Sequence, residues 1–578
     1  MISRSLLFIG CAAASLAPLA SDACADVSIS SPDQRWVAMI RDSGGGAGQC
    51  VKLEDQSQPA PLRNNVSQTI HYVRLAGGLQ FANTYTQRME DTFTLLRFAS
   101  TAHEFAAVLR SNTVAGVVAI VHGEMVSGAE GGLRVSLAFA DTTPAATLFA
   151  TVVKPFVYVN LNVDNQVAGN TGDWSVDHFA QTTTATGTGN VRWFAGRSPA
   201  AHASSHDGFM QSGLDLGLVE LNNLAFTGPG DINTAISFAQ SSLVAGATSV
   251  SAYAIGDEGI TVPNDFGFAP TVGAVGITSG DGRWGATVRT GYGAPDFGTA
   301  GTITSAADFD EPIATSSFLA SSTCYAAIGA GQGAASAPLS STFARIAFLS
   351  SASAPRMFMA VLNSKDDPGM IAIIDAQMLD GDSGGLVSDV VFANLGTTSL
   401  TVTPLVSADM DVDGTAINLG GFAASHFHQK SAARSANNVR WFRSDTFETY
   451  ESDEAIELSL AFDQGVTSLG DVVLPGPANL ATAFAYSPRV LAANQATSLA
   501  FAIGNAGIAI PASFAQPDGT PACPVDLNSD GAVDATDLAQ LLGAWGASQP
   551  GGAADLNGDG NVDASDLAIV LGAWGPCS

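Results

Sequence analysis

Short runs of apolar residues, some alternating with polar ones, recur along most of the chain and are separated by residues that favour turns. The clearest runs are 117–121, 133–139, 148–153, 156–163, 370–374, 400–406 and 456–462. Runs of this length, separated by roughly 8 to 15 residues, are typical of antiparallel β-strands. Before residue 510, no 12-residue stretch has the 3.6-residue period of an amphipathic helix. The pattern therefore predicts a mainly-β protein.

The same region contains an internal duplication. The strings Ser31–Trp36 and Val191–Phe194 return 248 positions later as Ser279–Trp284 and Val439–Phe442. Residues 178–256 align with 426–504 without a gap, and 23 of these 79 positions are identical. We predict two tandem homologous β-sandwich domains, because two sheets can each bury one alternating face. The alternative is a β-propeller, whose blades would repeat at about 40 to 50 residues.

The N-terminus has the features of an export signal. Arg4 provides a positive charge, residues 6–20 are apolar, and Ala23-Cys24-Ala25 is a cleavage site of small residues. We therefore expect a secreted or cell-surface protein, with a lipid anchor at Cys11 as the alternative. No later stretch reaches 18 apolar residues, so no membrane span is expected. The predicted organisation is a signal peptide at 1–25, β-sandwich copies at 27–262 and 275–510, linkers at 263–274 and 511–522, and a C-terminal module at 523–578.

The charge balance excludes one class of partner. The 578 residues include 53 acidic and 23 basic ones, which gives a formal net charge of -30. Nucleic-acid binding requires clustered Lys and Arg to neutralise phosphates, and only four lysines are present. We therefore expect no nucleic-acid partner.

The C-terminal module contains two twelve-residue loops rich in Asp and Asn, at 526–537 and 555–566. Oxygen-bearing side chains stand at positions 1, 3, 5, 9 and 12 of each loop, and Gly stands at position 6. This is the spacing of a calcium loop, in which position 7 contributes its backbone carbonyl. The expected ligands are Asp526, Asn528, Asp530, Ala532, Asp534 and Asp537, and then Asp555, Asn557, Asp559, Asn561, Asp563 and Asp566.

Each loop leads into a short apolar segment that closes with Gly-Ala-Trp-Gly, and position 12 is Asp instead of Glu. This pair of EF-hand-like loops resembles the type I dockerin family over residues 523–577. The resemblance implies a small α-helical module, two calcium ions as cofactors and docking to a cohesin domain. It places partner recognition on Ala535, Thr536, Ala564 and Ser565. Residues 516–578 contain no Lys, Arg or Glu, so the basic residues common later in dockerin helices are missing.

Four cysteines follow the predicted signal peptide. Cys523 and Cys577 flank the two loops, and the pseudo-twofold packing of a dockerin would bring both ends together. The resemblance therefore implies a disulfide between them, which an exported protein would retain. Cys50 and Cys324 lie at non-equivalent places in the two copies. They form either one bond between the copies or two unpaired thiols.

The string Gly381-Asp382-Ser383-Gly384-Gly385 matches the nucleophile region of chymotrypsin-like proteases, in which His and Asp activate the serine. In the aligned first copy, Glu130 replaces Ser383. A turn rich in glycine would serve both copies, so we expect a structural hairpin and no protease.

Three further groups of polar residues are candidate sites. His122-Gly123-Glu124 aligns with Asp375-Ala376-Gln377, which favours polar residues at a strand end over a metal site. A His, Gln and Arg set is retained in both copies, and a structural role is favoured over binding of a sugar or carboxylate. Alternating aspartates are expected to form a solvated sheet face instead of a calcium site. The His, Gln and Arg set is His178, Gln181 and Arg192 in the first copy and His426, Gln429 and Arg440 in the second. The alternating aspartates are Asp409, Asp411 and Asp413.

These observations together predict an exported, non-catalytic β-sandwich protein that attaches to an extracellular or cell-surface assembly through a calcium-dependent dockerin–cohesin interaction. One alternative is a dockerin-bearing glycoside hydrolase of polysaccharide catabolism, which would need two carboxylates about 5 to 9.5 Å apart. The other is an adhesive surface protein that binds polysaccharide or another glycan. The catalytic residues of such an enzyme are not apparent in the sequence.

Overall fold

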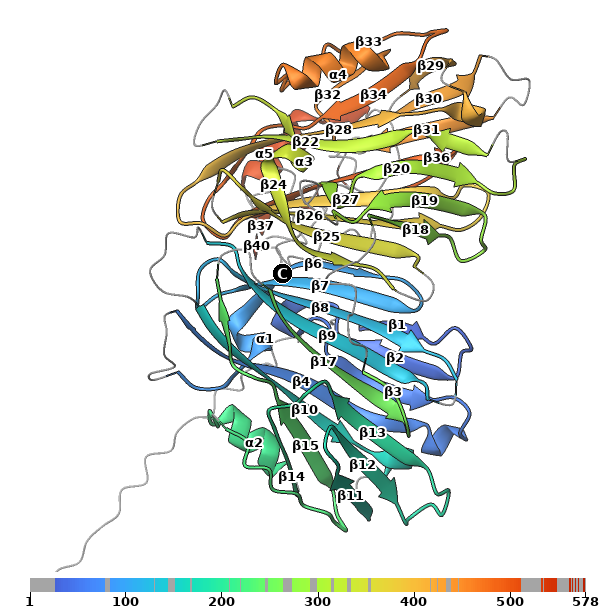
Figure 1. Cartoon of the computed structure of the whole chain (residues 1–578). Helices are drawn as coiled ribbons and strands as arrows, with labels where there is room; N and C mark the ends of the chain where they lie inside the picture. Colours follow the sequence, from blue (N-terminus) through green and yellow to red (C-terminus); the bar gives the residue numbers. More distant parts are fainter. Residues whose placement is uncertain are drawn as a thin grey trace, which may run out of the picture. The chain divides into compact units, whose positions relative to one another are not determined.

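The computed structural model describes residues 26–510 apart from short interruptions, together with parts of 532–576. The longest interruptions are 78–83, 144–150, 263–272, 292–298 and 433–437, and the described C-terminal parts are 532–533, 535–547, 561–562, 564, 567, 570 and 575–576. Residues 26–524 form one compact unit, and residues 525–578 belong to another. Strands make up most of the first unit (Figure 1), so the mainly-β fold class is confirmed.

The first half of the larger unit, residues 26–262, consists of two antiparallel sheets around one apolar core. The nine-stranded outer sheet has the order β1-β2-β3-β4-β10-β15-β14, with β5 beside β4 and β16 beside β10. The eight-stranded inner sheet has the order β11-β12-β13-β17-β9-β8-β7-β6. The strands are β1 Val27–Ser30, β2 Trp36–Ile40, β3 Cys50–Asp55, β4 Asn64–Gly77, β5 Gln87–Arg88, β6 Phe93–Ser100, β7 Glu104–Ser111, β8 Val117–Val126, β9 Gly132–Asp141, β10 Thr151–Leu161, β11 Asn170–Trp174, β12 His178–Thr183, β13 Val191–Gly196, β14 Ala201–His206, β15 Ile232–Ser237, β16 Ser241–Leu243 and β17 Thr248–Asp257.

The second half, residues 273–510, has the same kind of construction around its own core. Its eleven-stranded outer sheet has the order β18-β19-β20-β22-β28-β34-β32-β33, with β21, β23 and β35 alongside, and its inner sheet has the order β24-β25-β26-β27-β36-β31-β30-β29. The strands are β18 Ala274–Thr278, β19 Trp284–Arg289, β20 Ile303–Asp308, β21 Ser317–Leu319, β22 Ser321–Gly329, β23 Ala337–Pro338, β24 Phe343–Leu349, β25 Met357–Ser364, β26 Met370–Leu379, β27 Gly385–Asn394, β28 Leu400–Asp409, β29 Asn418–Ala423, β30 His426–Ser431, β31 Val439–Ser444, β32 Thr449–Glu454, β33 Val472–Val473, β34 Leu480–Ala485, β35 Arg489–Leu491 and β36 Ala496–Asn505.

Short helices cover the outer sheets. The helices of the larger unit are α1 Met89–Thr92, α2 Phe209–Asp215, α3 Leu339–Thr342 and α4 Ala455–Asp463. Helix α4 includes 456–462, which the alternating pattern wrongly predicted as a strand. The buried residues are Leu458 and Phe462, four positions apart, whereas Ile456 and Leu460 are exposed. The apolar residues therefore follow a helical repeat on one buried face, and the exposed pair only made the pattern look alternating.

Each half contains a buried tryptophan between two guanidinium groups. Trp36 lies 5.3 Å from Arg35 and 5.3 Å from Arg192, measured from the guanidinium carbon to the ring centroid. Trp284 lies 4.9 Å from Arg283 and 5.7 Å from Arg440. Cation–π attraction of this kind is stronger away from water, so both clusters stabilise the junction of the two sheets.

Buried carboxylates hold these arginines in place. Asp55 accepts hydrogen bonds from Arg35 and Arg192, and Asp308 accepts them from Arg283 and Arg440. Burial alone would raise the pKa of Asp55, but hydrogen bonds from Arg35 and Ser57 outweigh it and hold that pKa below its usual value. The carboxylate therefore stays charged in the interior, where an unpaired charge would be costly.

The two halves pack against each other through the outward faces of their inner sheets. Apolar residues of β6–β9 and β24–β27 form one continuous buried cluster that includes Val108, Ile120, Met359 and Ile373. Strands β7–β9 and β26–β27 are consequently buried on both faces. The two halves belong to one compact unit. The domain boundaries predicted from the sequence, 27–262 and 275–510, therefore stay a prediction.

One buried ion cluster crosses this interface. Arg97 of β6 donates to both carboxylate oxygens of Asp375 at 2.6 and 2.9 Å and lies 3.2 Å from Asp389. Burial raises the pKa of Asp389, while the charge of Arg97 opposes that rise. The strand registers give Ala347 as the counterpart of Arg97, and His122 and Ser136 as the counterparts of the two aspartates. Equivalent strands of the two halves therefore meet at the interface, but the buried ion cluster is present on one side only.

Candidate functional site

The C-terminal module contains two small antiparallel pairs of strands. Strand β37 (Ala532–Val533) pairs with β40 (Gly575–Pro576), and β38 (Gly546–Ala547) pairs with β39 (Asn561–Val562). Helix α5 spans Ala535–Gly543. Each loop strand therefore pairs with the segment that follows the other loop.

The two pairings repeat with the spacing of the two loops. Strands β37 and β39 occupy the same positions in their respective loops, and β38 and β40 occupy the same positions after them. Ala532 lies opposite Pro576, and Asn561 lies opposite Ala547. The two loop segments are thus related by a pseudo-twofold arrangement, as the dockerin resemblance implied, and neither can complete its strand pair alone.

Three apolar residues of the module are buried. Leu541 of α5, Val562 of β39 and Val570 are buried, with exposed fractions of 0%, 1% and 0%. Leu541 and Val570 are equivalent residues of the two repeats, as the strands are. Leu542 of α5 and Trp545, which follows the helix, are 51% and 48% exposed.

The residues of both loops fit calcium. The donor set consists of carboxylate, amide and backbone oxygens, which are the ligands that this hard cation prefers. The position-7 residues, Ala532 and Asn561, lie in the paired strands, and α5 begins three residues after Ala532. Asp537 lies in the first turn of α5. The other side-chain ligands fall outside the described residues, as do Ser565, Cys523 and Cys577; Ala535 and Thr536 begin α5, and Ala564 is an exposed helical residue.

Residues 524–572 match the dockerin type I domain family. This match confirms the predicted resemblance for this part of the chain. Type I dockerins bind calcium, and a dockerin implies a cohesin partner.

A solved structure gives a further match to the chain. The solved structures that match include a crystal structure of a bacterial glucoamylase complexed with acarbose, which is 9% identical and gives a TM-score of 0.28. The match covers 43% of this chain and 34% of that one, and at this TM-score it supports no functional argument. No curated protein matches the chain. None of the helices in the described residues is long and apolar enough to cross a membrane.

The protease-like motif is the turn between β26 and β27. Trp284 Nε1 donates to the carbonyl of Gly381 at 2.9 Å, and Asp382 pairs with Arg283 at 2.6 Å. A Cβ on Gly384 would overlap Trp284 Nε1, so only glycine fits there. In the first half, Gly131 approaches Trp36 in the same way. The motif closes a hairpin over the buried tryptophan.

His122 and Glu124 lie at the interface between the halves, and their interpretation as polar residues of a strand end was incomplete. Both are buried in β8, with His122 Nε2 3.5 Å from Glu104 Oε2. Ser351 of the second half donates its backbone N–H to Glu104 at 2.9 Å and its hydroxyl to Glu124 at 3.1 Å. These side chains join the two halves. The sequence carried a signal for them, because the aligned residues Asp375 and Gln377 are polar too.

The His, Gln and Arg sets do not converge on a ligand. Gln181 is buried and donates to the carbonyl of Leu161 at 2.8 Å, and Arg192 belongs to the tryptophan cluster. His178 points to the opposite face, where it stacks on Trp193 with ring centroids 3.8 Å apart. In the second half, Gln429 and Arg440 are buried and His426 stacks on Trp441 at 3.9 Å.

The aspartate set is not the solvated sheet face that the sequence predicted, because Asp413 is buried and only Asp409 lies on a strand. Neither this set nor the two cysteines of the larger unit form a catalytic or metal arrangement. Burial and the charge of Asp411 raise the pKa of Asp409 to about 6. Across the described residues, no group of three or more His, Cys, Asp or Glu could hold a metal ion. Cys50 and Cys324 are both free, and burial raises the pKa of each thiol to about 12. Both thiols therefore stay protonated at neutral pH.

Proposed function

We propose that this protein is exported and that its dockerin attaches a non-catalytic β-sandwich body to an extracellular or cell-surface assembly. The crossed strand pairing of β37 with β40 and of β38 with β39 carries the proposal, because it brings the two loop segments into one symmetric module. Two calcium ions would be held by the twelve loop residues named above. Their carboxylates would repel one another without the metal, so ion binding and folding of the module are coupled.

The first test is calcium-dependent retention of the full chain on immobilised type I cohesin domains. Wild-type protein should bind in millimolar calcium and elute with a chelator. The D526A/D555A variant removes the first ligand of each loop and should lose this retention, whereas S529A at position 4 of the first loop should keep it. Retention that persists with the chelator, or in D526A/D555A, contradicts the proposal.

We also propose the disulfide between Cys523 and Cys577. The pairing of β37 with β40 supports it, because it holds the end of the module beside the first loop. Pro576 lies opposite Ala532 of that loop, Cys577 is the next residue, and Cys523 precedes the same loop. Closing a loop of about 55 residues would stabilise the module by roughly 3 to 4 kcal/mol. Mass spectrometry of the non-reduced exported protein should find a peptide joining the two residues. A peptide that joins Cys523 to Cys50 or Cys324 would refute this pairing.

A further inference from the structure

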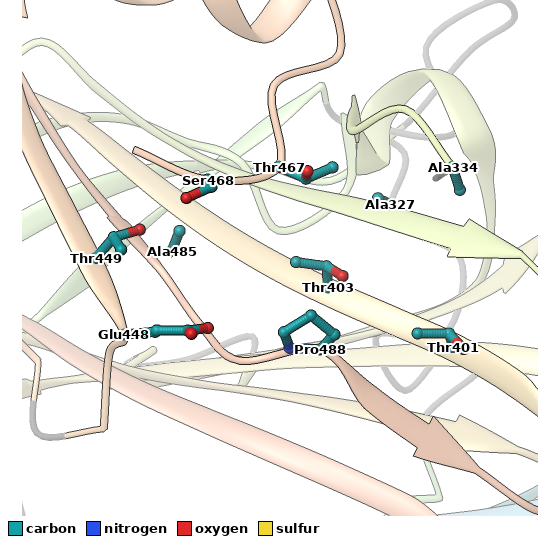
Figure 2. Close-up of a pocket in the computed structure, with 10 residues that line it drawn as sticks. All are labelled: Ala327, Ala334, Thr401, Thr403, Glu448, Thr449, Thr467, Ser468, Ala485 and Pro488. Atoms are coloured by element: carbon teal, nitrogen blue, oxygen red, sulfur yellow. The ribbon is translucent and has the colours of Figure 1, made fainter. Parts of the chain in front are cut away.

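A cavity of about 240 Å³ lies on the outward face of the second half's outer sheet, beside the segment that follows α4. Residues of β22, β28 and β34 contribute to its lining. Figure 2 shows that its lining is small or hydroxyl-bearing apart from one carboxylate. Thr401, Thr403, Thr449, Thr467 and Ser468 supply the hydroxyl groups, and Glu448 supplies the only charge.

The first half has long charged side chains at the corresponding positions. Thr403 corresponds to Lys154, since each precedes a proline in the equivalent strand. Thr403 lies opposite Ala327 and Lys154 lies opposite Arg74, so Ala327 corresponds to Arg74. Ser468 corresponds to Glu220 at the constant offset of 248. Three long side chains of the first half are therefore three short ones in the second.

The first half shows what fits this position. Lys154 is buried, forms an ion pair with Glu220 and lies 5.4 Å from the ring of Phe156. Arg74 Nε donates to the carbonyl of Thr84 at 3.0 Å. An ammonium group is thus accommodated on this sheet face when a carboxylate is beside it. The second half lacks these side chains and has a cavity in their place.

The second half has also gained a carboxylate at the same place. Ala200 and Glu448 are equivalent, because each donates its backbone N–H to the strand that forms the floor, at Ser237 and Ala485 respectively. In Figure 2 the side chain of Glu448, an exposed residue, extends toward Pro488. Among the described residues, no hydrogen bond or ion pair engages that carboxylate.

We propose that this cavity binds a small ligand that carries a primary ammonium group beside hydroxyl groups, as an amino sugar does. An ammonium has three donors and would use the carboxylate of Glu448 and the neighbouring threonine oxygens as acceptors. The volume is below the roughly 300 Å³ at which pockets for drug-sized ligands begin, which favours a single ring. This site does not depend on the dockerin function.

Ligand-observed NMR of the full chain with D-glucosamine, D-glucose and N-acetyl-D-glucosamine tests the proposal, at a pH at which the amine is protonated. Glucosamine should bind, and the two sugars without a free amine should bind at least tenfold more weakly. Equal binding of glucose, or no binding of glucosamine, overturns the proposal.

Two variants locate the binding. E448Q keeps the shape of the side chain and removes its charge, so it should weaken glucosamine binding at least tenfold, whereas E457Q on the exposed face of α4 should not change it. T403K restores the lysine of the first half and should block the cavity with its own ammonium. Melting temperatures confirm that each variant folds. Undiminished binding in folded E448Q overturns the assignment of this cavity.

Discussion

The two halves of the larger unit agree at their tryptophan clusters and differ on their outward faces and at the contact between them. Trp36 with Arg35 and Arg192 has its counterpart in Trp284 with Arg283 and Arg440. On the outward face, in contrast, Lys154 is replaced by Thr403. At the contact between the halves, Arg97 is replaced by Ala347.

The difference shows which positions each half needs for its own fold. A buried cation–π cluster with paired carboxylates is costly to change one residue at a time, because any single loss leaves a charge unpaired in the interior. Arg97 and Lys154 also pair with acids, but each of these pairs is present in one half only, so neither half needs it for the fold that both share. Differences between the halves therefore indicate positions that have acquired contacts of their own, such as those of the cavity and the contact face.

The largest effect is expected at the cluster that crosses the contact. R97A should lower the free energy of unfolding by about 3 to 5 kcal/mol, because Asp375 and Asp389 lose their buried partner. The triple variant R97A/D375H/D389S reproduces the symmetric counterpart of Ala347, His122 and Ser136, and it should recover most of the loss. Denaturant unfolding followed by fluorescence measures both. A triple variant no more stable than R97A would show that the two sides are not equivalent.

A smaller contrast is expected between the tryptophan clusters. Arg192 bonds to Asp55, Asp257 and Asn65, whereas Arg440 bonds to Asp308 and Asn505. R192M should therefore cost about 3 kcal/mol of unfolding free energy, and R440M about 1 to 2 kcal/mol, since fewer buried acids lose their partner. Thermal unfolding of both variants provides the comparison. A larger loss of unfolding free energy in R440M than in R192M would mean that the number of hydrogen-bond partners does not determine the loss.

The two halves should also differ in how their stability depends on pH. His71 is buried against Tyr253 with Nε2 2.8 Å from the hydroxyl, and burial lowers its pKa to about 4. The unfolded chain binds the proton near pH 6.5, so stability is lost as the pH falls from about 6.5 toward 4. The second half has Cys324 and Phe501 at these positions, and neither residue titrates in that range.

The variant H71V/Y253F tests this, since it gives the first half an apolar pair like that of the second. Between pH 7.5 and 5, the wild type should lose about 2 kcal/mol more unfolding free energy than the variant. Urea unfolding at both pH values measures the difference. Equal losses in the two proteins would show that His71 is not the group that titrates.

The smallest effect is expected at the stacked pairs His178–Trp193 and His426–Trp441. Cross-strand pairs of this kind contribute about 0.2 to 1 kcal/mol, so H178A and H426A should each cost about 0.5 kcal/mol. K430A, on the same strand as His426, is the matched control and should be neutral. A loss several times larger in either histidine variant would show that the stack does more than join neighbouring strands.

Much of this architecture could be predicted from the sequence because strand patterning is local. The runs 117–121 and 370–374 lie within β8 and β26. The dockerin loops were predictable because calcium dictates oxygen atoms at fixed intervals. Helix α4 was not predictable, since its four large apolar residues alternate in sequence and only the burial of Leu458 and Phe462 shows their helical repeat.

The contact between the halves and the cavity required the structure. Strands such as β8 and β26 are apolar without alternation, which indicates burial on both faces but does not say what covers the second face. The cavity depends on strand register, since only the pairing of Thr403 with Ala327 shows that these residues replace Lys154 and Arg74. A single-residue comparison of the two copies would have shown the substitutions without placing them side by side.

The apolar face shared by the halves has a consequence for biosynthesis. Translation completes the first half long before the second, and until then the outward face of β6–β9 has no cover. Exposed apolar surface of this kind associates with other chains and with chaperones. The nascent protein must therefore be kept from associating with other chains until the second half has folded, and neither half should be obtained as a soluble monomer when it is expressed alone.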